Sequence, residues 1–326
     1  MEQMNPSITD VLGIKVGHAQ NDDALTGCTV IICEKGATGG IDQRGGAPGT
    51  RETDLMRPMH LVDKVHAILL AGGSAFGLDA ATGVMKYLEE RKIGFNTGVA
   101  YVPIVAGAVI FDLAIGNSNI RPDAAMGYKA CQNASSLPPQ QGNAGAGSGA
   151  TVGKILGMEY ATKSGIGTFS IRIGNLVVGA IMVVNALGDV VEPDTGKIIA
   201  GVWQRDDKQK RYFADTLRIM QSMQGQDALK FASTENTVIG VVATNARLNK
   251  EQANKVAQMA QDGIALAVRP AHTMLDGDTI FALATNRVKA DVNIVGAFAA
   301  QAVANAIVTA VRSSQPVAGL PAANSL

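Results

Sequence analysis

A threonine stands where a polar stretch of the chain changes into a strand-like run. Thr237 follows Asn236 and begins the uncharged, β-branched segment Val238–Ala243, which reads as a buried strand. A hydroxyl can act as a nucleophile without a histidine when it belongs to the first residue of a chain, because the free α-amine then serves as the base. Cleavage of the Asn236–Thr237 bond would create that arrangement. The alternative is that Thr237 is an ordinary residue at the start of a strand.

Two aspartates are a second candidate for chemistry. Asp276 and Asp278 stand just before the strand-like run Ile280–Thr285, and side chains two residues apart point the same way on an extended backbone. Such a pair at the start of an apolar strand is unfavourable unless charges or hydrogen bonds meet it. The alternative is an Asp-Gly turn with solvated side chains. A calcium loop does not fit, because the further ligands of an EF-hand are absent from the sequence.

Lys154 and Asn185 complete the set of residues that we expect to serve a threonine nucleophile. Lys154 would supply positive charge, and Asn185 would supply an amide donor to the oxyanion. The four histidines have no recognisable nucleophile motif nearby, so we expect structural roles for His18, His60, His66 and His272. The three cysteines cannot all pair, which indicates reduced thiols and no metal site at Cys28, Cys33 and Cys131.

Two glycine-rich segments resemble phosphate-binding loops without meeting their templates. The first, Ile68–Leu78, runs from a strand through glycines into a helix, but no G-x-G-x-x-G can be written there. The second, Gly147–Lys154, has Ser148 where a P-loop needs its first glycine, and Ile155 stands where a hydroxyl should bind magnesium. We therefore expect these glycines to serve tight turns and close packing, and we expect no nucleotide or other cofactor.

Composition argues against several classes of protein. The chain has 326 residues, of which 47% are hydrophobic and 17% charged, with a formal net charge of +0. No stretch concentrates Lys and Arg, so a nucleic-acid partner is not expected. The start, MEQMNPSITD, lacks the basic and apolar parts of a signal peptide, which favours a cytoplasmic protein. The apolar run Ile294–Val311 contains Gln301 and Asn305, so it predicts a buried helix and no membrane span.

The elements that would position these residues mix meandering strands with long helices of small residues. Strand-like runs cover Gly13–Val16, Thr29–Cys33, Ala67–Ala71 and Ala106–Phe111, followed by a meander over Thr168–Val202. Helical patterns cover Leu78–Glu90, Ala124–Asn133, Arg211–Met223, Lys250–Val268 (with Asn249 as its N-cap) and Val292–Val311. This mixture predicts an α+β layered domain. Leu137–Gly153 and Gln224–Asn236 are predicted to be linkers, and the second ends at the candidate cleavage site.

Several long blocks of the sequence resemble one family of enzymes. The segment GGIDQRGGAPGTRETD, residues 39 to 54, is similar to the signature of the DmpA-like peptidases. These are the L-aminopeptidase/D-esterase enzymes, and their relatives include β-peptidyl aminopeptidases and nylon-oligomer hydrolases. Further blocks are similar in the same order: LAGGSAFGLDAATGV, GNAGAGSGATVGK, NTVIGVVATNARL and DGDTIFALAT. Together they cover the chain from about Gly13 to Val311, so the match is specific.

This resemblance implies an α+β fold, a four-layer α/β/β/α sandwich like that of DmpA and the ornithine acetyltransferases. It implies one catalytic domain, residues 1–326, that cleaves itself into residues 1–236 and 237–326, which stay associated. Thr237 matches the nucleophile, and the other matching active-site positions are Lys154, Asn185, Asp276 and Asp278. The implied assembly is a homo-oligomer, a tetramer of processed heterodimers.

The activity that the resemblance implies is amide hydrolysis by an aminopeptidase, which acts on short peptides or on amino-acid amides and esters. The nylon-hydrolase branch also has threonine after asparagine at this bond, but it carries a tyrosine where this chain has Phe111. Any hydrogen bond from that phenol is therefore missing here. Two other activities stay open: an acyltransferase of the ornithine acetyltransferase type, and an endo-hydrolase of ω-amino acid oligomers. The last alternative is a non-catalytic protein that binds a small metabolite.

Overall fold

A nine-stranded sheet forms the centre of the molecule. The computed structural model describes residues 6–223, 225, 227 and 236–325. The strand order is β10-β11-β16-β18-β2-β4-β7-β3, and β1 pairs with β2 beside this path. These strands are β1 (Lys15–Asn21), β2 (Thr26–Gln43), β3 (Thr50–Arg51), β4 (Lys64–Ala71), β7 (Val105–Val109), β10 (Ile166–Ile173), β11 (Leu176–Asn185), β16 (Thr237–Ala246) and β18 (Thr279–Val288).

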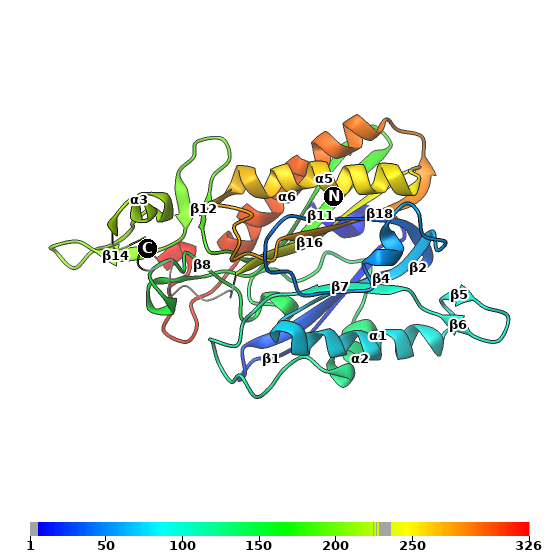
Figure 1. Cartoon of the computed structure of the whole chain (residues 1–326), viewed down its shortest axis with the longest axis horizontal. Coiled ribbons are helices and arrows are strands. Elements are labelled where there is room, and N and C mark those ends of the chain that lie inside the picture. The colour runs from blue at the N-terminus through cyan, green and yellow to red at the C-terminus, as the bar shows by residue number, and fades with distance from the viewer. Residues whose placement is uncertain (1–5, 224, 226, 228–235, 326) are drawn as a thin grey trace.

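Three buried clusters separate four layers (Figure 1). The helices are α1 (Ala80–Glu89), α2 (Ala124–Gln132), α3 (Thr216–Met220), α5 (Lys250–Ala267) and α6 (Val292–Arg312). One cluster joins α5 and α6 to the half of the sheet formed by β10, β11, β16 and β18. Another joins α1 and α2 to β2, β4 and β7, and the third lies between the two halves of the sheet. The fold is the α/β/β/α sandwich that the resemblance implies.

Both faces of the inner strands are buried, which explains their unbroken apolar runs. In β16, Val238 and Val242 pack toward α5 and α6, whereas Ile239 and Val241 pack toward the opposite half of the sheet. Each of these four side chains is at most 1% exposed. A slip of one residue would exchange the two packed faces, so packing fixes the register of β16 against its neighbours.

Short strands at the rim connect the loops around the sheet. They are β5 (Phe95–Asn96), β6 (Tyr101–Val102), β8 (Thr151–Val152), β9 (Thr162–Lys163), β12 (Asp189–Val191), β13 (Ile198–Ala200), β14 (Trp203–Arg205), β15 (Arg211–Phe213) and β17 (Val268–Arg269). β12 pairs with both β13 and β17. This pairing brings the chain that leaves β11 close to the chain that leaves α5.

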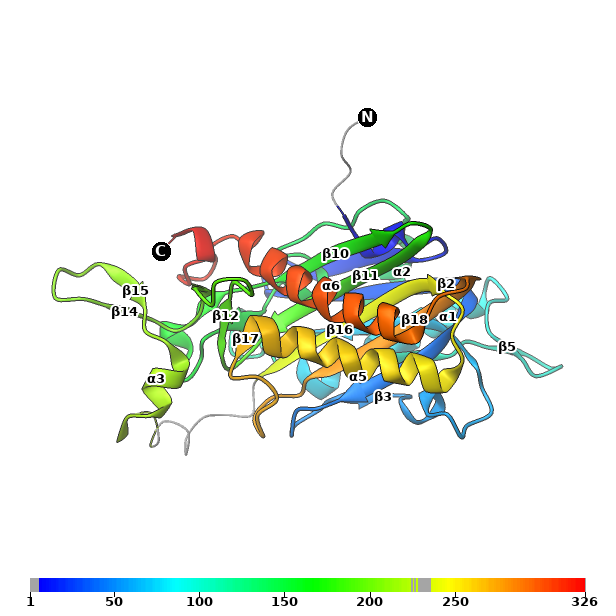
Figure 2. The ribbon, with the colours of Figure 1, turned by 90° about the horizontal axis from the view of Figure 1, so that it is seen from above.

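Small residues let α5 and α6 lie side by side on the sheet (Figure 2). A Cβ at Gly263 of α5 would lie only 2.2 Å from the carbonyl oxygen of Ala300 in α6, so the two backbones approach closely because this residue is glycine. α5 begins as predicted: the Asn249 side chain accepts from the Gln252 amide at 2.9 Å, and the Gln252 side chain accepts from the Asn249 amide at 3.1 Å. This capping box fixes the start of α5.

α6 is a core helix. Within the described part of the chain it is the helix that is long and apolar enough to cross a membrane, with 21 residues and a mean hydropathy of 1.8 in its most apolar stretch. However, 61% of that stretch is buried, and the helix packs against α5, β10 and β11. Its buried face joins the core through residues such as Val295, Ala299 and Ile307.

Most predicted elements are confirmed. Helices α1, α2, α5 and α6 lie where the sequence predicts them, and the predicted strand-like runs fall in β1, β2, β4 and β7. The predicted meander contains β10, β11, β12 and β13. Apart from residues 225, 227 and Asn236, the predicted linker Gln224–Asn236 lies outside the described residues.

The predicted helix Arg211–Met223 is wrong over its first half. Arg211–Phe213 is strand β15, which pairs with β14, and α3 begins only at Thr216. Asp215 adopts a φ of +66°, and its side chain accepts from amides of the first turn of α3. Asp215 therefore separates a strand from a short helix and caps the helix.

The predicted linker Leu137–Gly153 is wrong over its second half. Ala146 and Ala150 are fully buried between the two halves of the sheet. A Cβ at Gly147 would lie 2.4 Å from the amide nitrogen of Ile166. The abundance of glycine, which indicates an exposed linker in the sequence, here permits close packing.

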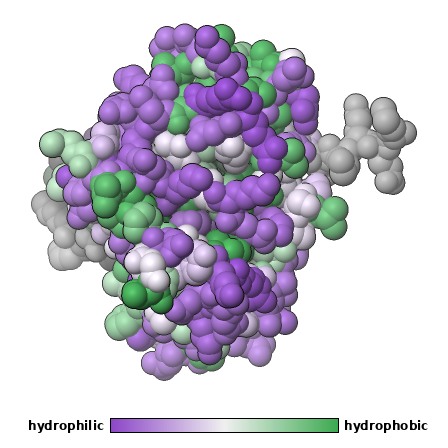
Figure 3. Space-filling view, turned by 90° about the vertical axis from the view of Figure 1, so that its right-hand side faces the viewer, coloured by the Kyte–Doolittle hydropathy of each residue, from purple (hydrophilic) through white to green (hydrophobic). Residues whose placement is uncertain are grey.

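Figure 3 looks onto the end of the molecule that carries the β5–β6 hairpin. Hydrophilic residues cover most of this face, and apolar groups stand among them in separate patches. The large apolar side chains of the described residues that are at least 85% exposed are Met59, Leu61 and Val99. Two of them precede β4 and one lies in the β5–β6 hairpin, so they can contact another molecule.

We expect Gly263→Ala to destabilise the protein by about 1–3 kcal/mol, although alanine is the better helix former. The added Cβ would meet the Ala300 carbonyl and push α5 away from α6. Gln258→Ala, at an exposed position of the same helix, is the matched control and should be close to neutral. Urea unfolding measures both free energies; equal values for the two variants would contradict the close packing of these helices.

Candidate active site

Strand pairing brings the candidate site together around Thr237. Thr237 is the first residue of β16 and pairs with Asn185, the last residue of β11. Asn236 forms a bridge with Asp276. Thr237 is 5% exposed and Asn236 2%. Because β16 runs parallel to β18, the segment with Asp276 and Asp278 enters the sheet beside Thr237.

The carbonyl oxygen of Asn236 receives two hydrogen bonds. The Thr237 hydroxyl donates to it, and the backbone N–H of Gly277 donates to it over 2.9 Å. A Cβ at Gly277 would lie 2.6 Å from the Ala47 carbonyl oxygen and 3.0 Å from the Thr237 hydroxyl oxygen. The hydroxyl thus lies beside the carbonyl group of the candidate cleavage bond. A backbone donor is aimed at the oxygen on which negative charge would develop.

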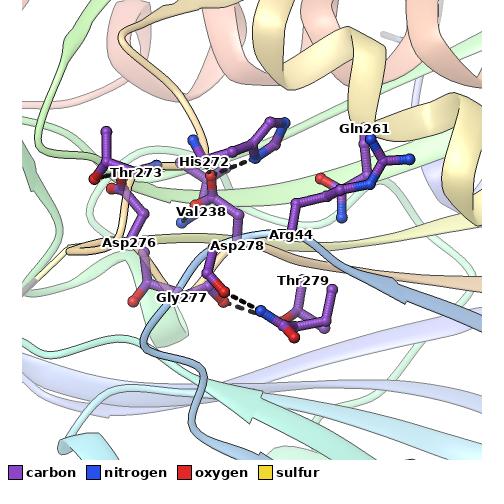
Figure 4. Close-up of polar contacts among 12 residues, drawn as sticks. Arg44, Val238, Gln261, His272, Thr273, Asp276, Gly277, Asp278 and Thr279 are labelled. Carbon is purple, nitrogen blue, oxygen red and sulfur yellow. Dashed lines mark hydrogen bonds and ion pairs between the residues drawn. The ribbon is translucent and has the colours of Figure 1, made fainter.

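The Asp278 carboxylate joins the start of β16 to the loop before β18. One oxygen accepts from the Val238 amide at 2.7 Å. The other accepts from the His272 amide at 3.0 Å and lies 2.8 Å from His272 Nδ1 (Figure 4). Asp278 is 1% exposed, so these contacts compensate for the burial of its charge.

Asp276 is buried to the same degree. Its carboxylate accepts from the Thr273 hydroxyl, from the Thr273 amide at 3.1 Å and from the Leu187 amide at 3.4 Å. Burial raises the pKa of Asp276 to about 6, and repulsion from Asp278 acts in the same direction. Asp276 therefore takes up a proton more readily than an exposed aspartate.

Lys154 and Asn185 form the other polar part of the site. Lys154 Nζ donates to the carbonyl oxygen and to the side-chain oxygen of Asn185, each at 2.9 Å. That side-chain oxygen also accepts from the Thr151 amide at 3.1 Å, and Asn185 Nδ2 donates to the Phe111 carbonyl at 3.0 Å. These contacts fix the orientation of the Asn185 side-chain amide, with its oxygen toward Lys154 and its nitrogen toward the Phe111 carbonyl.

A cavity of about 10 Å³ beside Lys154 is lined by residues that include Phe111, Thr151 and Met158. It has room for about one water molecule, so the uncut chain leaves no space for a substrate side chain at this point. Phe111 occupies the position at which the nylon-hydrolase branch has a tyrosine, so the cavity lacks the hydroxyl of that tyrosine.

All five predicted site residues lie in this one buried region of the fold. The interpretation of the aspartates as a solvated turn is wrong, because Asp276 and Asp278 are each 1% exposed. Their contacts also differ from the expected ones. In the uncut chain the carboxylates bind the amides of Val238 and Leu187, whereas the Thr237 hydroxyl binds the Asn236 carbonyl. The catalytic roles stay predictions.

Sequence analysis missed two residues of the site. His272, expected to be structural, contacts Asp278, and Gly277 supplies a backbone donor. The signal available in the sequence was the closeness of both to the two aspartates. His18 and His66 do fit the structural expectation: His18 Nδ1 lies 2.8 Å from the Thr29 hydroxyl, and His66 Nδ1 accepts from a backbone amide. Burial lowers the pKa of His18 to about 4.

The chain's own charged groups fill both glycine-rich segments. At the first, the Asp112 carboxylate accepts from the Gly73 amide at 2.6 Å and from the Thr26 hydroxyl at 2.7 Å. At the second, the fully buried ammonium of Lys163 donates to the carbonyls of Gly147 and Ala150 at 3.0 and 3.1 Å. These contacts support the interpretation that the glycines serve close packing.

The three cysteines are buried thiols. Cys28, Cys33 and Cys131 are unpaired and buried, as predicted, and burial raises the pKa of each thiol. Among residues 6–223, 225, 227 and 236–325, no group of three or more His, Cys, Asp or Glu side chains is placed to hold a metal ion.

Comparison with known proteins identifies the family. The model of peptidase family S58 matches residues 6–324. The chain belongs to this family. An "uncharacterized aminopeptidase" of Mycobacterium leprae is 44% identical over 97% of this chain and 92% of its own. A "6-aminohexanoate-oligomer endohydrolase" of a Kocuria species is 32% identical, and the match covers 86% of this chain and 75% of the relative.

A solved structure of an aminopeptidase has the same fold. The L-aminopeptidase D-Ala-esterase/amidase of Ochrobactrum anthropi superposes with a TM-score of 0.70 at 19% identity, covering 98% of this chain and 90% of that one. The resemblance to the DmpA-like peptidases is confirmed, and with it the sandwich fold. Membership of family S58 makes the chain a hydrolase of peptide or amide bonds.

We expect Asn185→Asp to lower the turnover of this S58 peptidase by roughly 100- to 1000-fold. The change keeps the oxygen that Lys154 and Thr151 contact but replaces the Nδ2 donor with a second oxygen. Turnover is measured on aminoacyl p-nitroanilides with folded, cleaved protein. Asn96→Asp, in the exposed β5–β6 hairpin, is the control and should leave turnover unchanged. Wild-type turnover in Asn185→Asp would remove Asn185 from the oxyanion role.

Proposed function

We propose that this chain is an aminopeptidase that cuts its own Asn236–Thr237 bond and then uses Thr237 as an N-terminal nucleophile. One observation carries the proposal: the Thr237 hydroxyl contacts the Asn236 carbonyl, which the Gly277 amide also binds. Nucleophile, scissile carbonyl and oxyanion donor are thus adjacent before any reaction occurs. The name of the 44%-identical relative, an aminopeptidase, supports the same activity.

Self-cleavage proceeds by transfer of an acyl group from nitrogen to oxygen. The Thr237 oxygen attacks the carbonyl carbon of Asn236, and the Gly277 amide stabilises the oxyanion. The C–N bond breaks, the hydroxyl proton passes to the departing nitrogen, and an ester joins Asn236 to the Thr237 side chain. Water hydrolyses this ester, which leaves a carboxylate on Asn236 and a free amine and hydroxyl on Thr237.

The free amine of Thr237 then serves as the base for peptide hydrolysis. The Lys154 ammonium, held 2.9 Å from both oxygens of Asn185, lies beside the residue that pairs with Thr237. A positive charge there disfavours the ammonium form of the Thr237 amine. The neutral amine can accept the hydroxyl proton as Thr237 attacks the substrate carbonyl.

The two products of cleavage would remain one folded unit. β16 lies between β11 and β18, and β18 pairs with β2 on its other side. Residues 237–325 thus supply two inner strands and the helices α5 and α6. Removing them would expose two buried clusters to water. Because that exposure is unfavourable, the two chains would stay together without the peptide bond.

The charges of the site favour a substrate with a free amino group. Two carboxylates of the site, Asp276 and Asp278, are buried; Asp278 contacts the imidazole of His272, whereas Asp276 accepts from backbone amides. A substrate ammonium would balance the remaining negative charge, whereas a blocked amine would leave that charge unbalanced. This balance supports action at the amino end of short peptides or amino-acid amides.

A second candidate is endo-hydrolysis of ω-amino acid oligomers, which the 32%-identical endohydrolase supports. Phe111 argues against it. The nylon branch has a tyrosine at this position, whose hydroxyl would lie in the cavity beside Lys154, and phenylalanine has no hydroxyl to place there. Acyl transfer to an amine would use the same acyl-enzyme and differs only in its acceptor. A homo-oligomer and a cytoplasmic location remain predictions; the exposed Met59, Leu61 and Val99 support contacts between copies.

We expect purified wild-type protein to separate into residues 1–236 and 237–326 without added protease, whereas Thr237→Ala stays a single chain. Alanine has no oxygen to attack the Asn236 carbonyl. Thr237→Ser, which keeps the hydroxyl, is the matched control and should still be cut. Intact mass measures all three. Cleavage of Thr237→Ala at the same bond would show that another group performs it.

We expect the cleaved enzyme to hydrolyse alanyl p-nitroanilide at least about tenfold faster than its N-acetyl derivative, since blocking the amine removes the positive charge that balances the buried carboxylates. Initial rates on both substrates measure the ratio. A 6-aminohexanoate dimer and a free amine acceptor, added in parallel assays, test the other two activities. Equal rates on blocked and free substrates would leave a hydrolase but remove the aminopeptidase assignment.

A further inference from the structure

His272 contacts the site through Asp278. Its ring Nδ1 lies 2.8 Å from the Asp278 oxygen that also accepts the His272 amide at 3.0 Å. The other oxygen of Asp278 binds the Val238 amide at 2.7 Å. A continuous chain of hydrogen bonds therefore runs from the imidazole, through the buried carboxylate, to the residue directly after the nucleophile (Figure 4).

We propose that His272 is a positioning residue: in its protonated form it anchors Asp278, and through Asp278 it holds the start of β16 and the Thr237 nucleophile in place. The inference rests on the proposed function of Thr237. It adds a residue outside the five that match the family's active site, and it assigns part of the pH dependence of turnover to that residue.

The surroundings of His272 favour its charged form. Burial alone would lower its pKa, but the hydrogen bond and the charge of Asp278 outweigh burial and raise it. The backbone carbonyl of Gln261 acts in the same direction, and the charge of Arg44 opposes it. Arg44 is itself paired with Asp42 at 2.6 Å, which weakens its effect on the imidazole. His272 is one-fifth exposed, so it can exchange a proton with solvent.

The backbone at His272 provides a matched variant. His272 adopts a φ of +57°, a conformation that asparagine accepts better than most residues. The Nδ2 of an asparagine stands where Nδ1 stands in histidine. His272→Asn therefore keeps a donor to Asp278 and suits the backbone, but it carries no charge at any pH. His272→Ala removes the donor and the charge together.

The two variants separate the hydrogen bond from the charge. Loss of a hydrogen bond to a charged group should make kcat of His272→Ala about tenfold lower than that of His272→Asn at every pH. The ratio of wild-type kcat to that of His272→Asn should be several-fold at pH 5.5. It should approach one as pH rises through the pKa of His272, which lies above 6.5. KM of both His272 variants should change little, because the substitution displaces the nucleophile and keeps the contacts that bind the substrate.

Stability follows the same titration. Because the pKa of His272 in the folded state is above its ordinary 6.5, the charged pair stabilises the fold fully below pH 6.5. This contribution is lost as pH rises through the folded-state value. The stability difference between wild type and His272→Asn should therefore shrink with rising pH. The NMR titration of His272 should show a pKa above 6.5, and Asp278→Asn should lower it.

The experiment is a pH series of kcat and KM on alanyl p-nitroanilide with fully cleaved wild type, His272→Asn, His272→Ala and the control His60→Asn. His60 is exposed, and it accepts from Lys250 through its backbone carbonyl. Its variant keeps that carbonyl and should match wild type at every pH. Equal kcat for His272→Asn and His272→Ala, or a wild-type to His272→Asn ratio that does not change with pH, overturns the inference. Activity of uncut Thr237→Ala would instead overturn the proposed function.

Discussion

The register between β11, β16 and β18 is the constraint on which the site depends. It sets Thr237 against Asn185 and places Asn236 beside Asp276. Both faces of β16 are packed, so the strand cannot slip by a residue without burying the wrong side chains. Hydrophobic packing in two layers of the sandwich thereby fixes the position of a hydroxyl whose own contacts are few.

Burying a charged group in this region costs free energy unless backbone groups form hydrogen bonds with it. Amides satisfy Asp276 and Asp278, while carbonyls satisfy the buried ammonium of Lys163. Burial lowers the pKa of Lys163 to about 7, and Asp112 partly offsets this effect. Lys163 binds the segment that leads to Lys154, so a buried charge outside the five predicted site residues shapes the loop that carries one of them. Polar contacts to the backbone thus rigidify a site built largely from loops.

Sequence reasoning found the residues whose chemistry is visible in a short motif. Thr237 stands out at the change from polar to apolar residues, and Asp276 and Asp278 stand out as paired charges before a strand. His272 could not be connected with Asp278, because that contact depends on a turn in which His272 adopts a positive φ. The donor at Gly277 is a backbone group, which composition does not reveal. Glycine in Leu137–Gly153 was ambiguous for the same reason: it suits exposed loops and close packing equally.

In the proposed mechanism, cleavage and turnover cannot share one base. In the uncut chain the nitrogen of Thr237 is an amide, so the first reaction depends on proximity and on the Gly277 donor. Only the product has a free amine, whose pKa suits a base near neutrality. On this proposal, departure of Asn236 would free the Gly277 amide, and the carbonyl of a substrate would occupy the place that the Asn236 carbonyl held. The uncut chain would therefore be the first substrate of the proposed enzyme, and its geometry indicates where we expect later substrates to bind.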